Sequence, residues 1–284
     1  MTSADALEGE HLHENDLSWR HTSAVSQPSL ESAQQLANAS KRRRSIPIRK
    51  GFIRSLTGDG APPLRRIYKG RSGEVALKLY LALMWRSSAK PFTTDRPYSA
   101  WARLLDLDDP PGSGSRQIRN ALRALERANL IALEPRPGKA PIVTILNELG
   151  GGEVYDPPHS RWTSATKNKR SKATKDKHRY FQIPEHLWTK GYIQSLRGPG
   201  LVMLLILLAE QSSELNPVWF STDQFPDRYG VSPSTRSKGT QELEFHHLLV
   251  VEKESVAANP RNNYWDPKAY RNLYRLTSLA TSLD

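Results

Sequence analysis

Residues 115–134, SRQIRNALRALERANLIALE, decide the fold that we predict. Ile118, Ala121, Leu122 and Leu125 recur at helical spacing, which indicates one buried stripe on a helix over 115–128. The opposite face carries six polar residues, Arg116, Gln117, Arg119, Asn120, Arg123 and Arg127. Solvated helix faces usually mix charges of both signs, whereas Glu126 is the only acid here. The face therefore favours contact with nucleic acid.

The flanking sequence places this helix third in a recurring order. An apolar helix over 73–88 comes first, and a short helix over 98–105 packs on it with Trp101, Leu104 and Leu105. The Pro- and Gly-rich turn that follows ends that helix, and we expect Ser113 or Ser115 to cap the next. Strands over 130–133 and 142–146 flank a turn that carries Arg136 and Lys139. A hairpin directly after a cationic third helix predicts a winged helix, with Arg136 and Lys139 on phosphate or the minor groove.

The second half of the chain repeats this order. FIRSL at 52–56 corresponds to YIQSL at 192–196, and a long apolar helix follows each, at 73–88 and 200–213. A proline-bearing extended piece comes next in both halves. Leu125 aligns with Leu243, and Leu130 with Leu248. A duplicated domain explains this shared order better than chance.

The second copy departs from the first in its third helix, predicted over 233–247. Its outward residues, with the hairpin tip, are Ser234, Thr235, Lys238, Gln241 and Arg261. Arg236 stands where the first copy has buried Ile118, so either it turns outward to DNA or the alignment is shifted by one. Gly239 weakens the helix by about 1 kcal/mol relative to Ala. We expect this less basic copy to bind DNA more weakly or to carry dimerisation.

These segments predict an α+β protein of two winged-helix (helix-turn-helix) domains in tandem, at 45–149 and 179–284. Residues 1–44 are rich in Ser, Gln and Glu without apolar periodicity and end in a basic run, so we expect a disordered arm. Residues 150–178 begin with glycines and become strongly cationic, which is typical of a flexible linker.

Composition limits the partners and the compartment. The net charge of +12 indicates a polyanionic partner. The absence of cysteine excludes disulfides, thiolate metal sites and cysteine nucleophiles. No signal peptide is recognisable, and the longest apolar run, 201–209, is too short to cross a membrane. We expect a cytoplasmic, nucleoid-associated protein with no membrane partner.

Residues 114–131 resemble the recognition helix and first wing strand of bacterial winged-helix DNA-binding proteins, and residues 230–249 resemble the same motif with the departures above. Two such domains with a basic tether are similar to theta-type plasmid replication initiators. The resemblance implies sequence-specific binding of double-stranded DNA at an origin or promoter. Transcriptional regulators and partition proteins use the same modules, so both remain alternatives. A second copy of the chain and host replication or transcription proteins are further candidate partners.

The sequence contains few residue patterns that are typical of catalytic or metal sites. His11 and His13 have the spacing of rolling-circle nucleases but sit in the acidic N-terminal segment, and no phosphate-binding Gly-Lys-Ser/Thr loop occurs. Asp106, Asp108 and Asp109 cluster beside a Pro-Gly turn, where acids are commonly solvated. We therefore predict no enzyme, no cofactor and no metal.

An alternative of another class remains open. RNA or single-strand binding would use exposed aromatic residues, for which Trp162, Tyr264 and Trp265 are candidates. A protein scaffold is the other alternative, and in this case the basic face would meet an acidic protein.

Overall fold

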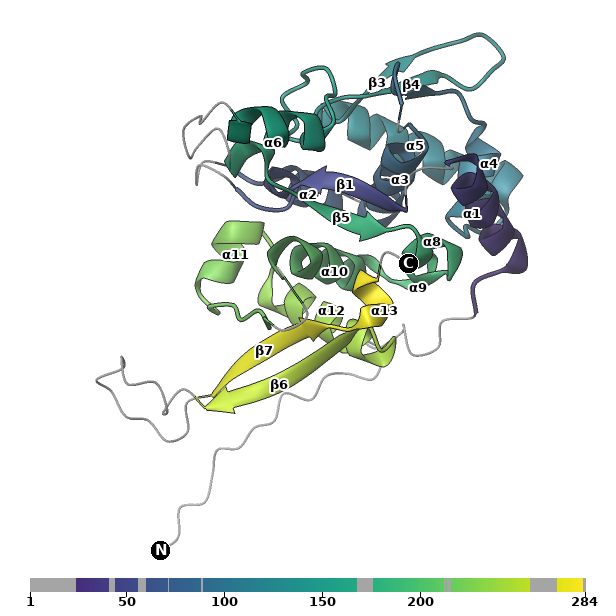
Figure 1. Cartoon of the computed structure of the whole chain (residues 1–284). Helices are drawn as coiled ribbons and strands as arrows, with labels where there is room; N and C mark the ends of the chain where they lie inside the picture. Colours follow the sequence, from purple (N-terminus) through teal and green to yellow (C-terminus); the bar gives the residue numbers. More distant parts are fainter. Residues whose placement is uncertain are drawn as a thin grey trace, which may run out of the picture.

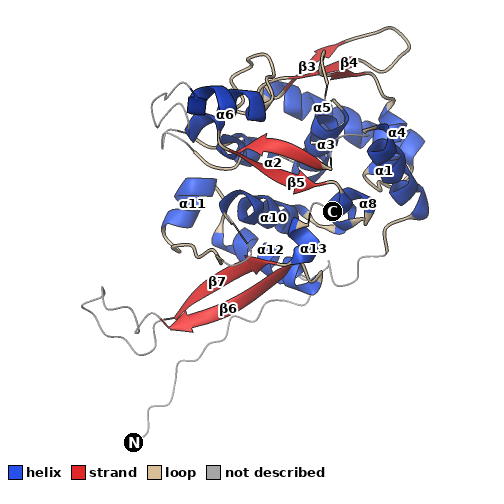
Figure 2. Ribbon diagram, viewed as in Figure 1, coloured by secondary structure: helices blue, strands red, loops and turns tan. Residues whose placement is uncertain are grey.

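Helices and short antiparallel strand pairs build a mixed α+β fold (Figures 1 and 2). The computed structural model describes residues 24–40, 44–55, 60–70, 72–87, 89–167, 176–211, 213, 216–255 and 270–282. The predicted α+β class is confirmed. No helix in these ranges is long and apolar enough to cross a membrane.

The first copy contains every element that its sequence predicts. Its core helix is α3 (Gly73–Arg86), whose long side chains from Leu77 to Trp85 are all buried. The surrounding elements are β1 (Ser45–Arg49), a helical turn at Lys50–Phe52, α2 (Pro63–Tyr68), β2 (Thr93–Thr94), α4 (Tyr98–Leu104), a wide helical turn at Pro110–Gly114, α5 (Ser115–Arg127), β3 (Ile131–Glu134) and β4 (Ile142–Ile145). The three strands β2, β4 and β3 form one antiparallel sheet in that order.

The second copy has the same succession. Its elements are β5 (Tyr180–Pro184), α8 (His186–Thr189), α9 (Tyr192–Ser195), α10 (Gly198–Glu210), α11 (Gln224–Tyr229), α12 (Pro233–Phe245), β6 (Leu249–Ser255), β7 (Tyr270–Leu276) and α13 (Ser278–Thr281). Val218 bridges to β7, as β2 pairs with β4 in the first copy.

The ends of the two third helices confirm the alignment of the copies. The Leu130 amide donates to the Leu125 carbonyl over 3.1 Å, and the Leu248 amide donates to the Leu243 carbonyl over 2.9 Å. Asn129 and His247, which precede these leucines, both adopt a left-handed φ of 56°. This is the usual geometry of a helix C-terminus, and His246 is the C-cap residue of α12.

The two copies share one core and are not independent domains on a tether. β1 pairs antiparallel with β5 along its whole length. Trp85 of α3 stacks on Trp188 of α8 with ring centroids 5.8 Å apart. The Lys78 ammonium donates to the Gln194 carbonyl over 2.9 Å. The relative position of the two copies is therefore fixed by packing.

The predicted disordered arm is wrong for residues 27–39, which form α1 (Gln27–Ala39) against α4. Sequence periodicity missed α1 because its buried face has one large apolar side chain, Leu36, beside small ones. The Ser29 hydroxyl donates to the Leu104 carbonyl over 3.0 Å, and Ala33 is fully buried. Residues 1–23, with His11 and His13, and the basic residues 41–43 lie outside the described residues.

The predicted flexible linker is likewise wrong for residues 158–167, which form α6 (Pro158–Lys167). Arg161 of α6 forms an ion pair with Asp156, and Pro158 is buried. Most of the expected cations of this segment lie in residues 168–175, outside the described residues.

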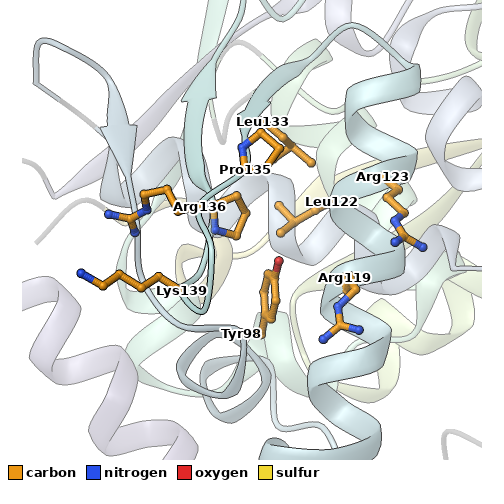
Figure 3. Close-up of a pocket in the computed structure, with 9 residues that line it drawn as sticks. Tyr98, Arg119, Leu122, Arg123, Leu133, Pro135, Arg136 and Lys139 are labelled. Carbon is orange, nitrogen blue, oxygen red and sulfur yellow. The ribbon is translucent and has the colours of Figure 1, made fainter.

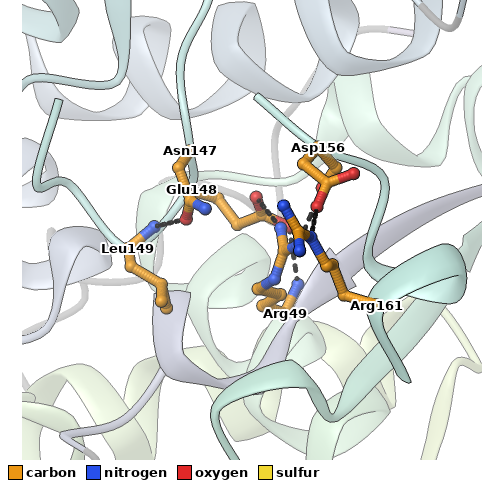
Figure 4. A network of polar contacts seen from close by, with 6 residues as sticks. All are labelled: Arg49, Asn147, Glu148, Leu149, Asp156 and Arg161. Atoms are coloured by element: carbon orange, nitrogen blue, oxygen red, sulfur yellow. Dashed lines mark hydrogen bonds and ion pairs between the residues drawn. The ribbon is translucent and has the colours of Figure 1, made fainter. Parts of the chain in front are cut away.

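A buried ion pair anchors β1 to the segment after β4 (Figure 4). Arg49 and Glu148 have no solvent-exposed side-chain surface, and Nη1 lies 2.6 Å from Oε2. Arg49 Nη2 also donates to the Asp156 carbonyl over 2.7 Å. The pKa of Glu148 is raised by burial, an effect that the positive charge of Arg49 opposes.

Candidate nucleic-acid interface

The turn before α5 is held by Asp109. Its carboxylate accepts from the Gly112 amide at 3.3 Å and from the Ser113 amide at 2.9 Å. Ser115 instead donates its hydroxyl to the Pro110 carbonyl over 2.7 Å. The expected caps Ser113 and Ser115 are therefore wrong, because the wide turn directs its amides at Asp109. A left-handed φ of 45° at Asp109 allows this, and Asp tolerates that conformation better than most residues.

α5 is amphipathic as predicted. Ile118, Ala121, Leu122 and Leu125 are each at most 1% exposed. The outward face is exposed at every predicted position, Arg116, Gln117, Arg119, Asn120, Arg123 and Arg127. The helix therefore presents a single cationic surface to solvent.

A cleft of about 190 Å³ lies between α5 and the β3–β4 turn (Figure 3). Tyr98 of α4 forms part of its wall, together with apolar residues of the hairpin. Its charged lining residues are Arg119, Arg123, Arg136 and Lys139, and no acid lines it. Sequence analysis selected all four cations but missed Tyr98, whose apolar surroundings looked like ordinary core.

Two of these cations have defined orientations. The Arg119 guanidinium lies 5.4 Å from the Tyr98 ring centroid, a cation–π distance that positions it on the cleft wall. Arg136 donates from Nε to the Ala140 carbonyl over 2.9 Å and pairs with exposed Asp95 at 3.2 Å. None of the ion pairs among the described residues involves Arg119, Arg123 or Lys139. These three charges are available to an anion.

The third helix of the second copy exposes fewer of its predicted DNA-contacting side chains to solvent. Ser234 is exposed, while Thr235, Lys238 and Gln241 are half-buried. The Thr235 hydroxyl lies 2.9 Å from the Ser232 hydroxyl, which also accepts from the Thr235 backbone amide at 3.2 Å. Arg261 lies outside the described residues.

The predicted outward orientation of Arg236 is wrong. Its Nη2 donates to the Tyr274 hydroxyl over 2.9 Å, and its guanidinium lies 4.8 Å from the Phe225 ring centroid and 5.6 Å from that of Phe220. The position corresponds to Ile118 after all, and cation–π packing lets an arginine occupy it.

Gly239 and Glu242 lie on the opposite side of α12, which packs against α10. A Cβ at Gly239 would collide with the Pro199 carbonyl oxygen, so glycine permits the close crossing of the two helices. The fully buried Glu242 carboxylate accepts from the Arg197 amide at 2.6 Å and the Gly200 amide at 2.9 Å, at the start of α10. The low helix propensity of Gly239 is thus offset by packing.

The other candidates have structural roles or remain outside the site. Asp106 accepts from the Ser26 backbone amide at 3.2 Å, and Asp109 caps the turn. Trp162 is half-buried in α6, and Tyr264 and Trp265 fall in the range 256–269, which the structure does not describe. Within the described part of the chain, no three His or acidic side chains cluster as metal ligands would.

Comparison with known proteins finds no matching family model, curated protein or solved structure.

Proposed function

We propose that the chain binds double-stranded DNA sequence-specifically through α5 and the β3–β4 turn, as a winged helix. The observation that carries the proposal is the cleft between these two elements, which is lined by Arg119, Arg123, Arg136 and Lys139 and by no acid. Phosphate groups supply the anionic charge that such a cleft accommodates, and phosphate contacts provide most of the affinity of DNA-binding proteins.

The exposed side chains of α5 divide into two roles. Arg116, Gln117 and Asn120 lie in the first half of the helix, which is the part that enters the major groove in helix-turn-helix proteins. Arg matches the acceptors of guanine, and Asn or Gln matches adenine, so these residues are assigned to base recognition. Arg119, Arg123 and Lys139 line the cleft and are assigned to phosphate.

The second copy contributes less to binding in this proposal. Thr235 is hydrogen-bonded to Ser232, aromatic rings enclose Arg236, and α10 packs against Gly239. The cleft of the first copy is lined by cations with one aromatic ring, which favours a duplex over single strands that stack on several aromatic rings. The biological role that we attach to this activity is the one that the resemblance implies, action at a replication origin or promoter.

Two glutamine variants test the assignment to phosphate. Arg119→Gln and Arg123→Gln should each reduce the slope of log K against log salt by about 0.9, which corresponds to about fivefold weaker binding at 0.15 M salt. The matched control is Arg86→Gln, because Arg86 is exposed at the far end of α3 and does not line the cleft. Unchanged affinity and slope in both cleft variants would overturn the proposal.

A third variant tests base recognition. Asn120→Ala should leave the salt slope near that of the wild type and relax the preference at one base position by about 1–3 kcal/mol. Selection of bound sites from random duplexes measures that preference. An unaltered selected sequence would contradict the role of Asn120.

A further inference from the structure

The short helix α2 lies between the third helices of the two copies. On one side, a groove of about 720 Å³ separates the end of α2 and the start of α3 from α5, with Ile67 and Gly70 on one wall and Asn120 and Arg127 on the other. On its other side, α2 packs against the turn before α12, where a Cβ added at Gly230 would collide with the Arg65 side chain. A duplex seated on α5 and extending toward α12 therefore passes α2.

α2 and its C-terminal residue carry three cations and no acid. Arg65 is half-buried, Arg66 is exposed and donates to the Leu149 carbonyl over 3.3 Å, and Lys69 is exposed at the C-terminal cap. Among the described residues, no carboxylate forms an ion pair with any of the three. The fold leaves this excess positive charge uncompensated.

The wall of the groove that α5 forms carries cations. Arg123 and Arg127 of α5 line it, and both are exposed. The acid on this wall, Glu126, accepts a hydrogen bond from the Leu133 amide at 3.3 Å, and this bond links α5 to β3 of the hairpin. Exposed Lys69 stands between the lining residues Ile67 and Gly70 in the chain, so positive charge borders the groove near α2 as well as on α5, which suits a phosphodiester chain.

We propose that α2 is a further DNA-contacting element, in which Lys69 binds a backbone phosphate of the duplex segment flanking the α5 site. The inference rests on the proposed function, because it requires a duplex on α5. It adds a contact outside the helix-turn-helix motif and extends the site toward the second copy. Lys69 carries no sequence information in this role, since phosphate contacts fix position rather than sequence.

The test compares Lys69→Gln with Lys190→Gln in the full chain. Lys190 is a matched control, because it too is an exposed lysine at the C-terminal cap of a short helix, α8. Binding is measured across salt on a selected site of about 10 base pairs, one helical turn, and on the same site extended by about one turn on each side. Lys69→Gln should weaken binding of the long duplex about fivefold at 0.15 M salt and lower its salt slope by about 0.9, with a smaller effect on the short one.

The outcomes separate this inference from the proposed function. If Arg119→Gln lowers the salt slope but Lys69→Gln matches wild type on both duplexes, the role of α2 is wrong and the function of α5 stands. An equal loss in Lys190→Gln would also overturn the inference, because general charge would then explain it. Wild-type protein that binds neither duplex would overturn both.

Discussion

Replacing Arg49 with Met should destabilise the whole chain, because it leaves Glu148 buried without its cation. Both side chains are fully buried and their charged atoms lie 2.6 Å apart. Removing one partner of such a pair typically costs about 3–5 kcal/mol. Arg49 also donates to the Asp156 carbonyl, and that bond is lost as well. We therefore expect a loss toward the upper end of this range.

Urea unfolding of the full chain at pH 7.5 and pH 5 measures the effect. Burial already raises the pKa of Glu148 above its usual 4.5, and removal of Arg49 takes away a charge that lowers it. A carboxyl with a raised folded-state pKa binds its proton more readily when folded, so its contribution to stability falls as the pH rises. The loss in Arg49→Met should therefore be smaller at pH 5 than at pH 7.5.

Two further variants make the result interpretable. Arg49→Met/Glu148→Gln should recover most of the loss, because a neutral pair carries no uncompensated charge. Glu252→Gln should cost about 1 kcal/mol or less, since the Glu252–Arg275 pair is about half exposed. A loss below about 1 kcal/mol in Arg49→Met, or no recovery in the double variant, would refute the reasoning.

Three other substitutions test the local structure by the same assay. Asp109→Ala should cost about 1–2 kcal/mol through the lost cap of the Pro110–Gly114 turn, whereas Asp109→Asn, which keeps an acceptor, should cost less. Equal losses would contradict the capping role. Gly239→Ala should destabilise the fold by about 1–3 kcal/mol, because the added Cβ would collide with the Pro199 carbonyl. This loss is expected despite the better helix propensity of Ala. A stabilised variant would show that α10 and α12 do not cross closely. Burial lowers the pKa of His246, so its neutral form is favoured in the fold. The free energy of unfolding of the wild type, relative to that of His246→Gln, should therefore fall as the pH drops below 6.5. Parallel dependence of the two unfolding free energies on pH would contradict this.

Hydrophobic periodicity was sufficient where large apolar side chains form the core. The stripe Ile118–Leu125 and the alignment of Leu125 with Leu243 needed only helical spacing and a shared order of elements. The cleft cations Arg119 and Arg123 followed from the same helix, because every polar position opposite the stripe is exposed. The shared order of elements in the two halves and the α5 face were therefore predictable from local sequence.

Features that depend on small residues or long-range contacts were not predictable in this way. α1 is buried through serines and Ala33, which carry little apolar signal. Arg236 is accommodated by the rings of Phe220, Phe225 and Tyr274, and no local pattern indicates that. The shared core of the copies depends on contacts such as Trp85 with Trp188, more than a hundred residues apart in the chain.

The most direct test of the central claim is a salt titration of wild-type protein and Arg119→Gln/Arg123→Gln against duplex DNA and the matching single strand. The account predicts that the wild type prefers the duplex, with log K falling steeply with log salt, and that the double variant lowers this slope by about 1.8. Tighter binding of the single strand, or a slope that the two cleft substitutions leave unchanged, would contradict it.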